Sequence, residues 1–160
     1  MKLLRIIAAV VTALYFCSCQ QNDIQIKQLT NIDSVADNDA ERALNMLDSI
    51  GPYMKNATKA SRNYYELLKI KAQDKAYIPH TSDSTITRLV EYYENKGDKR
   101  LLPKAYYYAG RIYRKLHDAT QAVKYFNMAE AAAKKIFKGH KAVGKHLRTS
   151  RIHSEISGIS

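Results

Sequence analysis

Several residue types are scarce in this chain, and each scarcity narrows what the chain can be. Among its 160 residues there are no tryptophans, three prolines, six glycines and two cysteines. The cysteines, Cys17 and Cys19, lie near the N-terminus, so the rest of the chain has no thiol for a disulfide or a thiolate metal site. The few helix breakers and the near absence of β-branched runs indicate helices whose stability comes from packing alone.

The first residues have the layout of a secretory signal. Lys2 and Arg5 precede an apolar run at residues 6–16, which is about half as long as a helix that crosses the ~30 Å core of a membrane. Cys19 follows a small residue, a pattern that resembles the bacterial lipoprotein signal. We therefore expect residues 1–18 to be removed and Cys19 to be acylated, which would anchor the protein in the cell envelope, facing the periplasm or the cell surface. Cleavage without a lipid is the alternative.

The chain is strongly basic, with a formal net charge of +11. Residues 1–18 contain two of the 26 Lys and Arg and none of the 15 Asp and Glu, so their removal leaves +9. Such a charge favours acidic partners or anionic lipid. No acidic residue lies between Glu130 and Glu155 in a run of lysines and arginines, a pattern that usually indicates nucleic-acid binding. Export disfavours nucleic acid, which leaves a solvated face, a lipid contact or an acidic protein contact.

The middle of the chain shows the spacing of amphipathic helices. Residues 19–37 are polar with isolated apolar residues, so we expect a flexible tether there. Apolar residues then recur every three or four positions in five segments. The expected breaks are at Gly51, Pro52, Pro79, Gly97, Asp118 and Gly139. No segment alternates like a strand, which predicts an all-α fold of antiparallel helical hairpins in a domain at 38–138.

One helix type occurs twice. Residues 118–126 can be laid on residues 39–47, where an aspartate, two alanines and a large apolar residue coincide. A repeated helix of this kind favours a stack of repeats over a simple bundle.

The segment at residues 103–136 resembles a unit of the tetratricopeptide-repeat (TPR) family, two helices in about 34 residues with small side chains where they cross. The positions that match in type and spacing are Tyr106, Gly110, Tyr113, Ala122, Phe126 and Ala129. Ala109, where the family prefers Leu, and Lys134, where a Pro is usual, depart from the pattern. The resemblance implies a short TPR-like solenoid, with an ordinary helical bundle as the alternative.

The whole pattern is similar to bacterial signalling proteins that carry an exported repeat domain, followed in longer members by a membrane helix and output domains. Residues 139–160 form a basic segment that we interpret as a partial helix of an incomplete further repeat. An unpaired terminal helix of this kind would leave an apolar stripe exposed. A truncated member of that group is therefore one interpretation of the chain.

In the TPR family the first helix of each unit lines a concave groove that holds a peptide or a partner helix. The resemblance implies that this groove contains Lys104, Tyr107, Arg111 and Arg114. Such a basic and aromatic wall suits an acidic extended segment, while ordinary exposed helix positions are the alternative.

Candidate residues for chemistry are missing. Of the five histidines only His146 and His153 share a helical face, and no carboxylate stands beside them at ligand spacing, so no metal site is expected. No phosphate loop or nucleophile elbow occurs, so we expect no catalytic residue and no cofactor. The function predicted is a non-catalytic scaffold for a protein or peptide, with a sensory fragment of a signal-transduction regulator as the alternative. The partner's identity and the oligomeric state stay open.

Overall fold

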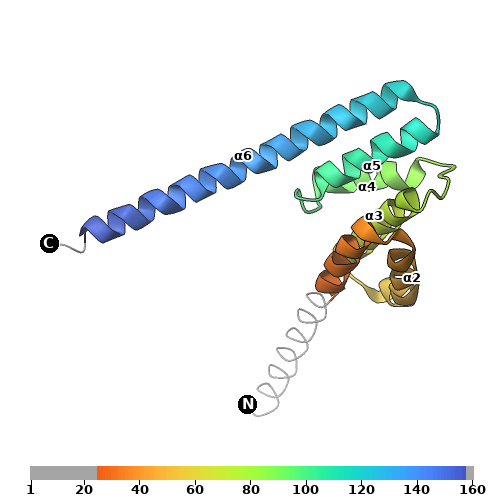
Figure 1. Ribbon diagram of the computed structural model, residues 1–160, viewed down its shortest axis with the longest axis horizontal. Coiled ribbons are helices and arrows are strands. Elements are labelled where there is room, and N and C mark those ends of the chain that lie inside the picture. Colours follow the sequence, from red (N-terminus) through yellow and green to blue (C-terminus); the bar gives the residue numbers. More distant parts are fainter. Residues whose placement is uncertain (1–24, 158–160) are drawn as a thin grey trace, which may run out of the picture.

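Helices joined by short connections make up the described part of the protein. The computed structural model describes the backbone of residues 25–157 and the side chains of residues 25–138. Its helices are residues 25–38, α2 (Ala40–Ile50), the 3-10 turn η1 (Gly51–Asn56), α3 (Lys59–Lys75), α4 (Ser84–Asn95), α5 (Leu102–Lys115) and α6 (Ala119–Ser157). No strand occurs in this range, and consecutive helices pack as antiparallel hairpins (Figure 1). The prediction of an all-α fold of helical hairpins is confirmed.

Capping residues explain where two of the helices begin. The Asp39 side chain accepts a hydrogen bond from the backbone N–H of Arg42 at the start of α2, at 2.9 Å. The Asp118 side chain accepts one from the N–H of Gln121 at the start of α6, also at 2.9 Å. Each bond satisfies one of the unpaired N–H groups of a helix N-terminus. The two aspartates are the matched positions of the repeated segment, so that segment begins the second helix of a hairpin in both places.

Helices α3 and α5 end in the same way. A residue just past each helix is left-handed although it is not glycine, Tyr77 with a φ of 59° and His117 with a φ of 62°. The N–H of the next residue donates to the carbonyl five positions back, at 2.9 Å in both cases. This is the long hydrogen bond of a Schellman cap. The two matching caps lie 40 residues apart in the chain, as the residue numbers 77 and 117 show. This spacing is about six residues longer than a TPR unit of about 34 residues.

The expected tether at 19–37 is in large part a helix. From residue 25 to residue 38 the chain is helical, and Leu29, Ile32 and Ala36 are buried against α2 and α3. These three residues recur at the spacing of one helical face. The physical reason for the difference is that a few well-spaced apolar residues are enough for a helix once a neighbouring hairpin offers an apolar surface. The helical domain therefore begins before residue 38.

The core consists of two clusters that share α3. Leu68 belongs to a cluster with the helix at 25–38 and α2, whereas Leu67 belongs to one with α4 and α5. Adjacent positions on a helix point about 100° apart, so α3 can supply apolar side chains to both clusters. This places α3 at the centre of the array, with the helix at 25–38 and α2 on one side and α4 and α5 on the other.

Helix α6 is longer than the sequence pattern predicts. The pattern predicts an end at Gly139, but α6 continues without a break to Ser157. A glycine inside a helix costs about 0.5–1 kcal/mol, and no proline follows it, so the surrounding helix formers continue the helix. Figure 1 shows α6 pairing with α5 and then extending past the other helices.

Candidate functional site

Three parallel helices form one face of the array. In the helix at 25–38, Asp33 pairs with Lys71 of α3 and Asp37 pairs with Lys75. The later residue of one helix thus meets the later residue of the other, so the two helices run parallel. Helices α3 and α5 also run parallel, because Asp74 near the end of α3 pairs with Arg111 and Lys115 in the last turns of α5. The second helices of the hairpins lie outside this row. We call this face the charged face and define it by the residues Asp33, Asp37, Lys71, Asp74, Lys75, Lys104, Arg111 and Lys115.

Asp33 is the centre of the first charge cluster on this face. Lys71 Nζ donates to Asp33 Oδ1 at 2.7 Å and to the Asp33 backbone carbonyl at 2.8 Å. The Tyr64 hydroxyl donates to Asp33 Oδ2 at 2.8 Å, and Lys104 also pairs with Oδ2. Burial acts to raise the pKa of the Asp33 carboxyl, but the hydrogen bonds from Lys104 and Lys71 together hold it below its ordinary value. Asp33 is therefore a carboxylate held by three donors from two other helices.

The ion pair between Lys104 and Asp33 joins helices that are not neighbours in the stack. Lys104 begins α5, whereas Asp33 lies in the helix at 25–38, and α3 runs between them. Contact across an intervening helix requires the three-helix face to be concave. Lys71, whose side chain is 4% exposed, lies beneath this contact and also pairs with Asp37 at 2.8 Å. We call the concave surface between the two outer helices the groove, and the ion pair between Lys104 and Asp33 bridges it.

Asp74 is the centre of the second cluster. Its side chain is 3% exposed and pairs with Arg111 Nη2 at 2.8 Å and with Lys115 Nζ at 2.9 Å. Burying a carboxylate at this depth is unfavourable unless cations accompany it. Both cations come from α5, so this cluster fixes α5 on α3.

An open cleft of about 410 Å³ lies at this end of the groove. Asp37 and Lys75 line it from the first two helices of the face, and Tyr107 and Arg111 line it from α5. Tyr77, which is 88% exposed, stands at its edge in the left-handed cap of α3. The cleft therefore combines exposed aromatic rings with charges of both signs.

The four residues expected to line a groove have different surroundings. Tyr107 is 42% exposed and Arg111 lies beside it in the cleft, so the structure brings these two together. Lys104 lies farther along the face, at the contact with Asp33. Arg114 is exposed near the end of α5 and does not line the cleft. Lys104 and Arg111 are both neutralised by carboxylates of other helices, so this wall is less basic than the sequence suggests.

The residues expected to pack one hairpin lie where α5 meets α6. A Cβ on Gly110 would come within 2.7 Å of the Phe126 ring, so the close approach needs glycine. Tyr113 stacks on Tyr125 with ring centroids 5.4 Å apart and donates a hydrogen bond to Asp83 of the α3–α4 connection. Three further positions of the pattern, Tyr106, Ala122 and Ala129, are buried or half-buried.

The acidic residues of the groove had no distinctive signal in the sequence. Asp33 and Asp37 lie in the segment expected to be a tether, and Asp74 is one of many acids in polar helix positions. Lys71 offered a usable sign, because it falls on the apolar stripe of α3, where a lysine needs a buried partner. A search for a carboxylate opposite that lysine could have found the cluster.

Several other predictions concern chemistry or lie outside the described residues. Cys19 and the segment 1–18 are outside them, as are the side chains of residues 139–160. Among the described residues, no cluster of three or more His, Cys, Asp or Glu could hold a metal ion. Within the same range, no helix combines the length and the apolar character that a membrane crossing requires. No protein-family model, curated protein or solved structure matches the chain.

Proposed function

We propose that the protein is a non-catalytic scaffold of the TPR type that binds an extended segment of another protein along the charged face. The observation that carries this proposal is the concave row of three parallel helices with an open cleft of about 410 Å³ at one end. In TPR proteins the first helices of successive units line such a groove, and helix grooves of this kind bind peptides through a few anchoring side chains. The repeat of α3 and α5 and the packing of Gly110 on Phe126 support the TPR assignment.

The charges of the groove favour an acidic segment. The charged face has five cations and three carboxylates, which leaves a net charge of +2. Lys75 and Arg111 remain partly exposed at the cleft, where a partner's carboxylate can share them. Tyr77 and Tyr107 offer rings for an apolar or aromatic side chain of the same segment. The partner we expect therefore combines acidic and aromatic residues.

The proposed location is the bacterial cell envelope, with the protein attached to a membrane through a lipid on Cys19. The support is the signal-like sequence at residues 1–18 and the small residue before Cys19. Globomycin, which blocks lipoprotein signal cleavage, should cause a larger precursor to accumulate, whereas a protein without the lipid should be processed as before.

The groove can be tested without removing a charged partner of its buried carboxylate Asp74. Arg111 is a poor choice for mutation because its loss leaves Asp74 buried with one cation fewer. We choose Tyr107→Ala with Lys75→Gln, since both side chains are at least one-third exposed. The same pair of changes at Tyr53 and Lys55, both exposed in η1, is the matched control.

We expect cross-linking in cells followed by purification to recover a partner with the wild-type protein and with the η1 control, but at least tenfold less with the groove variant. Circular dichroism should show equal helix content in all three proteins. Equal recovery with the groove variant would show that the charged face is not the binding site.

A second candidate function is the sensory part of a signal-transduction regulator. The observation that favours it is α6, whose 39 residues far exceed the 14 of its partner α5 and could transmit a binding event along one rod. An open reading frame that continues past Ser160 into a membrane helix would support this function. An in-frame stop codon at that point in the genomic DNA would oppose it.

A further inference from the structure

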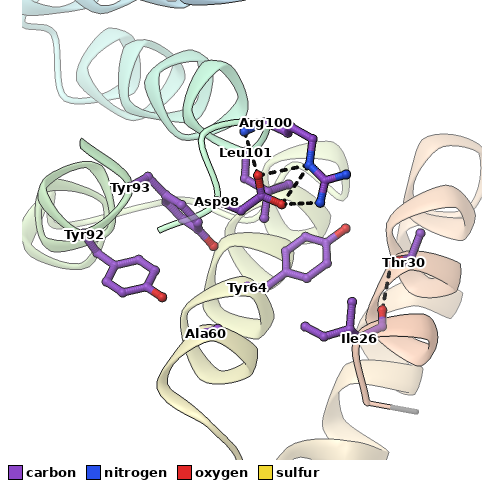
Figure 2. A pocket seen from close by; sticks show the side chains of 9 residues that line it. All are labelled: Ile26, Thr30, Ala60, Tyr64, Tyr92, Tyr93, Asp98, Arg100 and Leu101. Atoms are coloured by element: carbon purple, nitrogen blue, oxygen red, sulfur yellow. Dashed lines mark hydrogen bonds and ion pairs between the residues drawn. The ribbon is translucent and has the colours of Figure 1, made fainter. Parts of the chain in front are cut away.

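A second cleft, of about 330 Å³, lies at the opposite end of the same three helices (Figure 2). Ile26 of the first helix, Ala60 and Tyr64 of α3, and Tyr92 and Tyr93 of α4 line it, and most of its lining is apolar. Figure 2 shows these side chains on three separate ribbons facing a common space. Its volume is in the range of pockets that hold small molecules.

Tyr93 is the notable residue of this cleft. Its side chain is 1% exposed and packs edge-on against Tyr92, with ring centroids 5.1 Å apart. Among the described residues its hydroxyl has no hydrogen-bond partner, whereas the neighbouring Tyr64 hydroxyl donates to Asp33. Buried polar atoms are normally paired, so an unpaired one that borders a cleft needs an explanation. Figure 2 shows the Tyr93 hydroxyl pointing toward the space between Tyr64 and Tyr92.

The charged groups at the cleft neutralise each other. Among the described residues the charged members of the lining are Asp98 and Arg100, and Arg100 binds both carboxylate oxygens of Asp98 at 2.7–3.1 Å. An ionic ligand would therefore find no unpaired opposite charge there. Burial and the neighbouring Tyr92 raise the pKa of the Tyr93 phenol above its ordinary value, so at neutral pH the hydroxyl keeps its proton and can donate it.

We propose that this cleft binds a small uncharged molecule with an aromatic or branched aliphatic body and one oxygen acceptor, to which the Tyr93 hydroxyl donates a hydrogen bond. The apolar walls take the body of the molecule, and the buried Tyr93 hydroxyl fixes its orientation. This inference does not depend on the scaffold function, because the cleft lies away from the charges that would bind a partner segment.

The experiment is an NMR titration of the full-length chain with three probes of similar shape. Acetophenone has the carbonyl acceptor, ethylbenzene lacks it, and benzoate replaces it with a charge. We expect acetophenone to bind most tightly and to shift the backbone amides of Ile26, Ala60 and Tyr93. Tyr93→Phe should weaken acetophenone about three- to tenfold, the size of one neutral hydrogen bond, and should leave ethylbenzene unchanged.

Two further variants keep the test decisive. Tyr108→Phe removes another buried phenol hydroxyl outside this cleft and should change the binding of neither acetophenone nor ethylbenzene. Ala60 is exposed at the cleft, so Ala60→Phe should fold and should block both acetophenone and ethylbenzene. The proposal would be overturned if acetophenone bound Tyr93→Phe as tightly as the wild type, or if Ala60→Phe left its binding intact.

Discussion

Replacing Lys71 with methionine tests whether the buried charge cluster stabilises the fold. Lys71 is 4% exposed and donates to Asp33 twice, at 2.7 and 2.8 Å, and pairs with Asp37 at 2.8 Å. Methionine fills a similar volume but removes the charge and the donors. The Asp33 carboxylate, 15% exposed, would then keep, among the described residues, Lys104 and Tyr64 as side-chain donors, and its backbone carbonyl would lose a donor.

The expected magnitude follows from burial. Removing one partner of a buried ion pair costs about 3–5 kcal/mol when the other partner is left alone. Because Asp33 keeps two donors and Asp37 keeps Lys75 at a half-exposed site, we expect a smaller loss of about 2–3 kcal/mol in the free energy of unfolding. For a chain of this size that corresponds to a fall in Tm of roughly 4–12 °C.

The chain offers a matched control two residues away on the same helix. Lys69 is 40% exposed and pairs at 3.3 Å with Asp48, which is 66% exposed. Lys69→Met should therefore cost less than about 1 kcal/mol. Urea denaturation followed by circular dichroism at pH 7 measures both variants. Equal losses in the two variants would refute the reasoning, because the buried cluster would then contribute no more than a surface pair.

Acid pH supplies a second check on the same cluster. The pKa of Asp33 is lowered in the fold despite burial, through its bonds to Lys104 and Lys71. A lowered carboxyl pKa adds stability above its unfolded value near 3.9, and that stability is lost as pH falls through the folded pKa. The difference between wild type and Lys71→Met should therefore shrink below about pH 4. A difference that stayed constant down to pH 2 would point to packing rather than charge.

Three further predictions concern the hairpins. Gly110→Ala should lower the free energy of unfolding by about 1 kcal/mol, because the clash of its Cβ with Phe126 outweighs the gain in helix propensity; a neutral result would mean that the ring moves freely. Asp39→Ala should cost about 1 kcal/mol by removing the cap of α2, and Asp39→Asn should restore most of it. Burial, and next the nearby Lys115, lower the pKa of His80. The unfolded chain therefore binds the proton at a higher pH than the folded chain does, so acid below about pH 6.5 favours unfolding. The urea midpoint of the wild type should therefore be lower at pH 5 than at pH 7, and this decrease should be smaller in His80→Gln.

The sequence could predict the helices because their signals are local. Apolar spacing along α3, α4 and α5 and the caps at Asp39 and Asp118 lie within a few residues of the structures they determine. The observed ends of these three helices agree with the expected segments to within a few residues. The helix at 25–38 was missed because its three buried residues depend on a surface that α2 and α3 provide. The end expected at Gly139 was wrong because a glycine weakens a helix without stopping it.

The candidate site depended far more on the fold. The sequence pattern places Tyr107 and Arg111 on one side of α5, and the structure brings them together in a cleft. It could not show that Lys104 reaches Asp33, 71 positions earlier in the chain, because that contact depends on how tightly three helices curve together. The pairing of Arg111 with Asp74 was hidden for the same reason.

The sequence by itself therefore determined the helical class, the repeated capped helix and the close crossing at Gly110, since each rests on neighbours in the chain. Only the tertiary structure decided which charges are compensated. Ion pairs such as Lys104 with Asp33 bring together side chains that are distant in sequence, and their energy depends on burial that no local pattern records. The groove that looked uniformly basic in the sequence is, in the folded protein, a row of paired charges with an open cleft beside Tyr107.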